Sequence, residues 1–331
     1  MVAKPFRVAA LPALSQERIV LVFAVALFAL YALILPGFLA PGNLVAIVRS
    51  VAVLGILAVG MGIVVIGRGI DLSMIAVMAM ATAWQLQLMT DGTGALAATV
   101  LVGAAVVGIG LFNGLLIAYG NVPAVFATIA SAAMVFGVIR SQLITQDTIP
   151  VPAEGGFLLA FGQWRPAGLP AEVVTFAIVA LLALLLLRFT RAGRYIYYSG
   201  DNAEAARITG LPVRPLVMLQ YVLSSLAGWL AGLVTAAGLQ TINTRIVNST
   251  LLYDVILVVV IGGIGLSGGR GGVRNVVVGA LFIGILLNGM IILDLPHIWQ
   301  NLIKALILLA ALIVDGQLNP RDEQVGQQGD I

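Results

Sequence analysis

The sequence contains no cysteine and a single histidine, His297, among its 331 residues. The lack of cysteine excludes disulfide bonds and thiolate metal sites, and one histidine cannot form a metal site built from several imidazoles. Charged residues make up only 9% of the chain, whereas about 25% is usual for a soluble domain. The composition therefore excludes an ordinary soluble enzyme, and no set of nucleophile and base is present. We expect no catalytic residue, no metal and no cofactor bound by this chain.

Apolar residues are correspondingly abundant, since 61% of the chain is hydrophobic and its mean hydropathy is +1.10. A helix needs about 20 apolar residues to cross a bilayer, and uniformly apolar runs do not match the alternating strands of a barrel. We predict an all-α, polytopic membrane helix bundle of about ten spans. The predicted spans cover residues 19–36, 50–66, 72–89, 95–118, 123–143, 171–188, 215–238, 252–266, 275–293 and 298–314.

The first apolar run follows a basic segment, so a cleaved signal peptide is the alternative to a first span. We favour a retained span, because the run is long for a signal peptide and no small-x-small cleavage site follows it.

Lysine and arginine near the ends of spans mark the cytoplasmic side of a membrane protein. With a cytoplasmic N-terminus, the inner set is Lys4, Arg7, Arg18, Arg68, Arg188, Arg191, Arg194, Arg207, Arg214, Arg270, Arg274 and Arg321. The smaller outer set is Arg49, Arg140, Arg165 and Arg245. We therefore predict that both termini are cytoplasmic. The resulting division is a cytoplasmic tail at 1–18, a membrane domain at 19–315 and a cytoplasmic tail at 316–331. The membrane domain would carry an external loop at 144–170 and a cytoplasmic loop at 189–214.

The longest polar interruption lies between Arg188 and Pro215 and is rich in arginine. Asp201 or Asn202 is a suitable N-cap, residues 203–209 favour helix, and Gly210 followed by a proline ends it. A capped helix in a basic loop between membrane spans is typical of a docking element.

Two glycine-rich segments interrupt the apolar runs. The first, G-R-G-I-D-L-S at 67–73, is either a cytoplasmic turn or a broken element that lines a pathway or contacts a partner. Arg68 and Asp71 are three residues apart, so they can pair if the segment is helical. The second, G-G-I-G-L-S-G-G-R-G-G at 262–272, predicts a hinge or a tight packing element. No G-x-x-x-x-G-K-[ST] motif occurs in the chain, so we expect no bound nucleotide.

Polar residues within the apolar runs are costly when they face lipid, so we expect them to face the bundle interior. They would form hydrogen bonds between helices or line a wet path. Lys304 either extends toward the membrane surface or pairs with an acid such as Asp254. The candidate pathway or hinge residues are Asp71, Ser73, Asn113, Asp254, Gly262, Gly263, Gly268, Gly269 and Asn288.

The motifs taken together, in order over about residues 19–315, resemble the permease subunits of bacterial ABC importers of the ribose and branched-chain amino acid type. The matching segments are Gly67–Ser73, Asn113-Gly114 followed by Pro123, Gly193–Gly210 and Gly262–Gly271. The chain departs from the family pattern at Arg68, where a small residue is usual, and at 251–256, where only Asp254 of the usual Glu-Leu-Asp-Ala form is kept. The sugar-transporting branch is the more similar one.

The resemblance implies that the chain lies in a bacterial inner membrane, so that the external loop at 144–170 would be a periplasmic loop. It also implies a division of labour among several chains. Two permease chains, identical or related, would form the pathway, a cytoplasmic ATP-binding subunit would supply energy, and a periplasmic solute-binding protein would deliver a monosaccharide-like solute. The helix in the cytoplasmic loop would seat in a groove of the ATPase. The implied coupling residues are Gly193, Gly200, Asn202, Ala203, Ala205, Ala206 and Gly210.

Several alternatives stay open at this point. Similar permeases carry rhamnose or autoinducer-2. An ion-driven secondary transporter would rely on Asp71 and Asp254, and a membrane scaffold would carry no solute. We expect no nucleic acid partner, because the basic residues are accounted for by topology.

Overall fold

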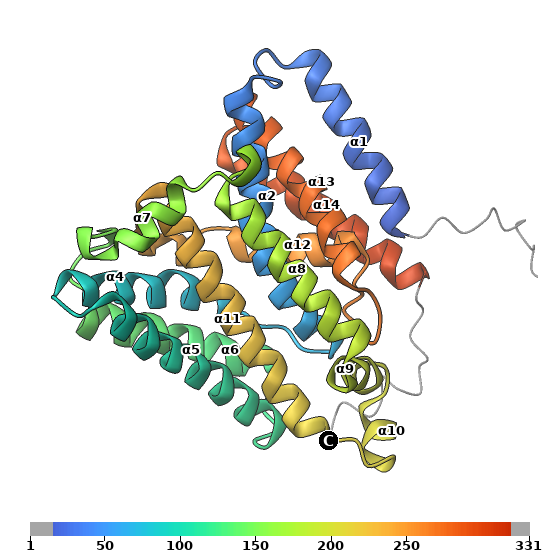
Figure 1. Ribbon diagram of the computed structural model, residues 1–331. Coiled ribbons are helices and arrows are strands. Elements are labelled where there is room, and N and C mark those ends of the chain that lie inside the picture. The colour runs from blue at the N-terminus through green and yellow to red at the C-terminus, as the bar shows by residue number, and fades with distance from the viewer. Residues whose placement is uncertain (1–15, 319–331) are drawn as a thin grey trace, which may run out of the picture.

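The computed structural model describes residues 16–318, and Figure 1 shows a bundle of helices. The helices that are long and apolar enough to cross a membrane are α1 (Gln16–Ile34), α2 (Pro41–Ile66), α5 (Ala95–Ala118), α6 (Ala124–Val138, continued by the π-helical turn η2, Ile139–Leu143), α8 (Ala171–Phe189), α11 (Val213–Leu239) and α13 (Val273–Ile292). Shorter apolar helical segments cover Met74–Thr90, α12 (Leu251–Gly262) and the first part of α14 (His297–Leu318). The predicted all-α, polytopic bundle is confirmed.

Each predicted apolar run contains helix, and the helices extend slightly beyond the predicted membrane domain. Helix α1 begins at Gln16 and α14 continues to Leu318, past the expected boundaries at 19 and 315. The rest of the two predicted tails, 1–15 and 319–331, lies outside the described residues.

Helix α2 occupies the centre of the bundle and packs against α8, α11, α12 and α13. Its second half, from Leu54 to Ile66, is buried throughout. Small residues allow this close packing, because they let neighbouring helices approach. The ring of Phe176 fills the space beside Gly55, and the methyl group of Ala227 lies against Gly60.

Two of the membrane segments are broken. The third predicted span consists of α3 (Met74–Ala76), a π-helical turn η1 (Val77–Ala81) and α4 (Thr82–Thr90). The eighth predicted span contains only the short helix α12, which follows strand β2 (Thr241–Asn243) and the 3-10 turn η5 (Thr244–Asn248). Because η5 contacts both α3 and η1, the two broken segments meet inside the bundle. Single π-helical turns within α-helices are frequent at functional sites.

The predicted periplasmic loop is ordered. It contains strand β1 (Thr148–Pro150), the turn η3 (Ala153–Gly155), helix α7 (Gly156–Gln163) and the turn η4 (Pro166–Gly168). Strand β1 pairs antiparallel with β2, with Ile149 opposite Ile242. Asp147 forms ion pairs with Arg140 and Arg245, each at 2.9 Å. The loop is thereby attached to η2 and to the start of η5.

The predicted cytoplasmic loop holds two helices where the sequence predicts one. Helix α9 (Arg191–Asp201) precedes α10 (Ala203–Ile208), and both lie at the end of the bundle opposite α7 (Figure 1). We call these the α9 end and the α7 end. The buried residues of α9, Gly193, Ile196, Ser199 and Gly200, recur at helical spacing. Two of them are glycines and one is a serine, so the amphipathic pattern is not apparent in the sequence.

Candidate functional site

Helix α10 has the ends that the sequence predicts. Asn202, and not Asp201, is the N-cap, because its Oδ1 accepts a hydrogen bond from Ala205 N at 2.9 Å. Thr209 is the C-cap, and Gly210 follows with a φ of 79°. Glycine suits that left-handed conformation, which other residues adopt at a cost.

The exposed surface of α10 does not include all of the small residues that the resemblance implies for coupling. Ala205 and Gly210 are exposed and Ala203 is half-buried, but Ala206 is only 4% exposed. Ala206 therefore packs against this chain itself and does not belong to the exposed face. The most prominent apolar side chain is Ile208, which is 80% exposed. Sequence reasoning missed it because it considered the small residues alone.

The two glycines of α9 fix the helix to the bundle by backbone contact. A Cβ on Gly193 would overlap the backbone of Leu186 and Leu187 in α8. A Cβ on Gly200 would overlap the carbonyl oxygen of Ile66 and approach Gly269 N. Larger residues cannot occupy either position without moving the backbone.

The predicted glycine breaks meet at this point. Gly269 N donates a hydrogen bond to Ile66 O at 2.8 Å, and a Cβ on Gly268 would approach Gly200 O. We call Ile66, Gly200, Gly268 and Gly269 the glycine junction. It joins the end of α2, the end of α9 and the connection between α12 and α13.

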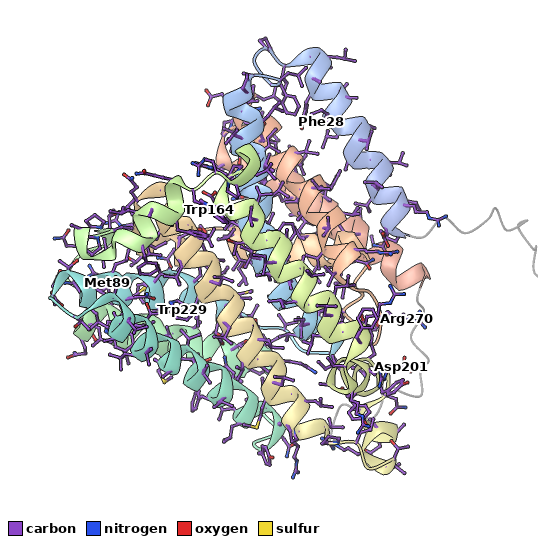
Figure 2. All side chains as sticks on the ribbon, viewed as in Figure 1. Phe28, Met89, Trp164, Asp201, Trp229 and Arg270 are labelled. Atoms are coloured by element: carbon purple, nitrogen blue, oxygen red, sulfur yellow. The ribbon has the colours of Figure 1, made fainter. Side chains whose placement is uncertain are left out.

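Tyr197 adds a side-chain contact to the glycine junction. Its hydroxyl donates a hydrogen bond to Gly271 O at 2.8 Å. Burial raises the pKa of Tyr197 above its ordinary value, so the hydroxyl keeps its proton and remains a donor. Figure 2 places Asp201 and Arg270 in this region as well.

The first glycine break is not helical, so the suggested pairing of Arg68 with Asp71 is wrong. Arg68 has a φ of 71° and is exposed, whereas Asp71 is fully buried. A turn at Gly67 and Arg68 separates α2 from α3 and directs the two side chains apart.

Asp71, Ser73 and Asn113 form a buried polar network together with Ser131. The Ser73 hydroxyl donates to Asp71 Oδ1 at 2.6 Å, and Asn113 Nδ2 donates to Ser73 Oγ at 2.9 Å. Ser131 Oγ donates to Asn113 Oδ1. The network ties the first break to α5 and α6 and gives Ser73, Asn113 and Ser131 partners that they would lack in lipid. Asp71 Oδ2 has no hydrogen-bond partner among the described residues.

The remaining predicted site residues lie elsewhere. Asp254 pairs with Lys304 at 2.8 Å, and Lys304 Nζ also donates to Thr250 Oγ1 at 2.7 Å, so Lys304 turns inward. Asn288 exchanges two amide hydrogen bonds with Asn43 on α2, at 2.8 and 3.1 Å.

Gly262 and Gly263 end α12. Gly263 has a φ of 98°, and Gly262 O accepts a hydrogen bond from Asn275 Nδ2 at 2.6 Å. The predicted pathway set is thus divided among several places in the bundle.

One buried charge pair is absent from the sequence predictions. Glu172, at the start of α8, is only 4% exposed and faces Arg49 on α2 at 3.5 Å. The sequence places both residues at span ends, where a charge is unremarkable. Only the packing of α8 on α2 brings them together.

The fold defines a multi-pass helical membrane protein with a small helical segment, α9 and α10, at one end. A family model described as "Branched-chain amino acid transport system / permease component" matches residues 43–312. The chain belongs to this family of permeases, in its ribose and simple-sugar branch. It is a multi-pass protein of the bacterial inner membrane.

Curated relatives cover most of the chain. The ribose import permease protein RbsC of Escherichia coli (strain K12) is 33% identical over 309 residues, which are 91% of this chain and 94% of the relative. The galactofuranose transporter permease protein YtfT of the same organism is 36% identical over 278 residues, 83% and 80% of the two chains. The L-arabinose ABC transporter permease protein AraH of Azospirillum brasilense is 32% identical over 309 residues, 91% and 88%. No solved structure matches the chain.

Proposed function

We propose that this chain is the transmembrane permease subunit of an ATP-driven importer of a monosaccharide-like solute. Relatives whose names specify ribose, galactofuranose and L-arabinose support this solute class. A separate ATPase subunit would bind on the cytoplasmic side, a periplasmic binding protein would deliver the solute, and a second permease chain, the same or related, would complete the pathway. The chain itself would bind no nucleotide, cofactor, metal or nucleic acid.

The proposed topology has ten crossings with both termini in the cytoplasm. Seven helices are long and apolar enough to cross a membrane, and three shorter apolar segments would supply the other crossings. Helices α7 and α9 lie at opposite ends of the bundle (Figure 1). The arginine-rich α9 end would be cytoplasmic, by the tendency of basic residues to remain inside, and the α7 end would be periplasmic.

The observation that carries the proposal is the continuous path from the exposed helix α10 to the centre of the bundle. Ile208 would insert into a groove of the ATPase, where burial of an apolar side chain stabilises the contact by about 1.5–3 kcal/mol. Helix α9 would transmit the movement of α10, because Gly200 contacts the end of α2 and the α12–α13 connection directly. One displacement at the ATPase would thus reach both broken membrane segments.

The charge arrangement leaves an ion-driven secondary transporter a single candidate carboxylate. Asp254 is already paired with Lys304 at 2.8 Å. Asp71 Oδ1 accepts from Ser73, whereas Asp71 Oδ2 has no hydrogen-bond partner among the described residues. An ion carrier needs a carboxylate that exchanges its ion on each cycle, so this alternative would rest on Asp71 alone.

Reconstitution tests the proposal. The purified chain, with its ATPase and a solute-loaded binding protein, is expected to accumulate radiolabelled sugar in proteoliposomes only when ATP is supplied. Ribose, L-arabinose and galactofuranose are the first solutes to compare. Accumulation by the chain alone under a Na⁺ or H⁺ gradient would show that the proposed function is wrong.

A further inference from the structure

A half-open cavity of about 250 Å³ lies at the α7 end of the bundle. Its walls come from α2, η1, α8, α11, η5, α12 and α13. It lies beside the first turn of α8 and the last turns of α11, the two helices against which α7 packs. The cavity is therefore formed by residues of one chain and lies on the side from which solute would arrive.

The cavity contains the charge pair that sequence reasoning missed. Arg49 Nε and Glu172 Oε1 are 3.5 Å apart, which is too long for a strong charged hydrogen bond. Arg49 Nε and Glu172 Oε2 are buried and have no hydrogen-bond partner among the described residues. The pair thus retains a free donor and a free acceptor, both on side chains that line the cavity.

Gly238 makes room for this arrangement. A Cβ at Gly238 would overlap Glu172 Oε1, so only glycine leaves the carboxylate in its place. Buried polar atoms without partners are rare and call for an explanation such as a ligand. The Glu172 side chain is 5% exposed, and burial of a carboxylate oxygen that lacks a hydrogen bond is expensive even when the charge has an ion-pair partner.

The other lining groups define the chemistry of the ligand. Thr235 supplies a hydroxyl group, and Val53, Leu54 and Met78 form an apolar wall, while Ser50 lies at the exposed rim. Thr235 donates its proton to Ala231 O at 2.7 Å, so its oxygen is left as an acceptor. A guanidinium beside a carboxylate is neutral overall and offers donors and acceptors together. A sugar ring fits this set, because its hydroxyl groups donate and accept and its C–H face is apolar.

The volume agrees with a small ring. It is several times the roughly 30 Å³ that one water occupies, and it lies just below the range of about 300–1,000 Å³ typical of drug-sized ligands. We infer that this cavity is a transient binding site for a neutral, polyhydroxylated ring. Glu172 accepts from its hydroxyl groups and Arg49 donates to them. This inference rests on the proposed function and adds where, within one chain, the solute is held.

The absence of cysteine permits a direct test by site-specific labelling. Ser50→Cys places the only thiol of the chain at the cavity rim, and Val45→Cys, on the exposed surface of α2, is the matched control. Each variant is assembled with ATPase and binding protein and labelled with a small, water-soluble methanethiosulfonate. Binding protein loaded with sugar is expected to slow labelling at position 50 several-fold, compared with empty binding protein, and to leave labelling at position 45 unchanged.

A second variant ties the protection to the charge pair. Glu172→Gln in the Ser50→Cys background keeps the shape of the side chain and removes its charge, and it is expected to abolish the protection by sugar. If this variant does not assemble, Arg49→Gln combined with Glu172→Gln removes both charges together and serves the same purpose.

The outcomes separate this inference from the proposed function. ATP-dependent sugar uptake by the Ser50→Cys transporter without protection of the thiol would overturn the cavity site alone. Protection that persists in the Glu172→Gln variant would also overturn it. A complete transporter with unmodified chain that shows no ATP-dependent uptake would overturn the proposed function, and the inference with it.

Discussion

The two ends of the molecule are held together in different ways. Near the α7 end, side chains join the elements through ion pairs and amide pairs, as between Asp254 and Lys304 or Asn43 and Asn288. At the α9 end, main chain meets main chain at the glycine junction. A long side chain can change rotamer while its neighbours stay in place, whereas a backbone contact transmits displacement directly. The difference suggests that the α9 end conducts movement and the α7 end accommodates solute.

The largest expected effect on stability comes from removing a side-chain ion pair near the α7 end. Lys304→Met leaves Asp254 buried without its cation, which costs about 3–5 kcal/mol when one partner of a buried pair is removed. Unfolding of the purified protein in detergent, titrated with a denaturing surfactant, measures the loss. Asp254→Asn combined with Lys304→Met is the control, and it should recover most of the stability. Equal stability of the single and double variants would contradict the assigned pairing.

The next largest effect on stability is expected from disturbing the backbone contacts of the glycine junction at the α9 end. Gly200→Ala introduces a Cβ that overlaps Ile66 O, and such overpacking costs about 1–3 kcal/mol. Gly108→Ala is the matched control, because no heavy atom lies within 4 Å of the corresponding Cβ. The midpoint temperature of thermal unfolding in detergent is expected to fall for Gly200→Ala and not for Gly108→Ala. A Gly200→Ala protein as stable as the parent would mean that the junction is looser than described.

A smaller effect is expected at the cap of α10. Asn202→Ala removes the hydrogen bond to Ala205 N, which costs about 1 kcal/mol at a helix N-cap. Asn202→Asp retains the acceptor and should preserve the helix. Proteolysis within residues 203–212 reports local opening, so faster cleavage is expected for the alanine variant only. Identical cleavage of both variants would argue against the cap.

The order and type of the helices could be predicted from the sequence, because lipid leaves the backbone no partner outside a helix or closed barrel. The helix in the polar loop was also predictable, since Asn202 and Gly210 mark its two ends by local chemistry. Helix α9 was missed because its apolar spacing is short and lies among arginines and glycines.

Contacts between distant segments could not be derived in the same way. Asn113, Asp254 and Asn288 were each expected to face inward, but hydropathy does not fix the rotation of a helix about its axis. The Arg49–Glu172 pair and the glycine junction likewise depend on which helices pack together. Ile208 could not be predicted for a related reason. The sequence shows which residues belong to α10, but it does not show which side of this helix faces away from the bundle.

The central claim is that α10 receives the driving force from an ATPase, and Ile208 tests it most directly. Ile208→Glu alters a side chain that is 80% exposed, so its effect on unfolding should stay within about 0.5 kcal/mol. In proteoliposomes with ATPase and loaded binding protein, we predict that Ile208→Glu abolishes sugar uptake while Ile208→Leu retains it. Normal ATP-driven uptake by a correctly inserted Ile208→Glu protein would contradict the account.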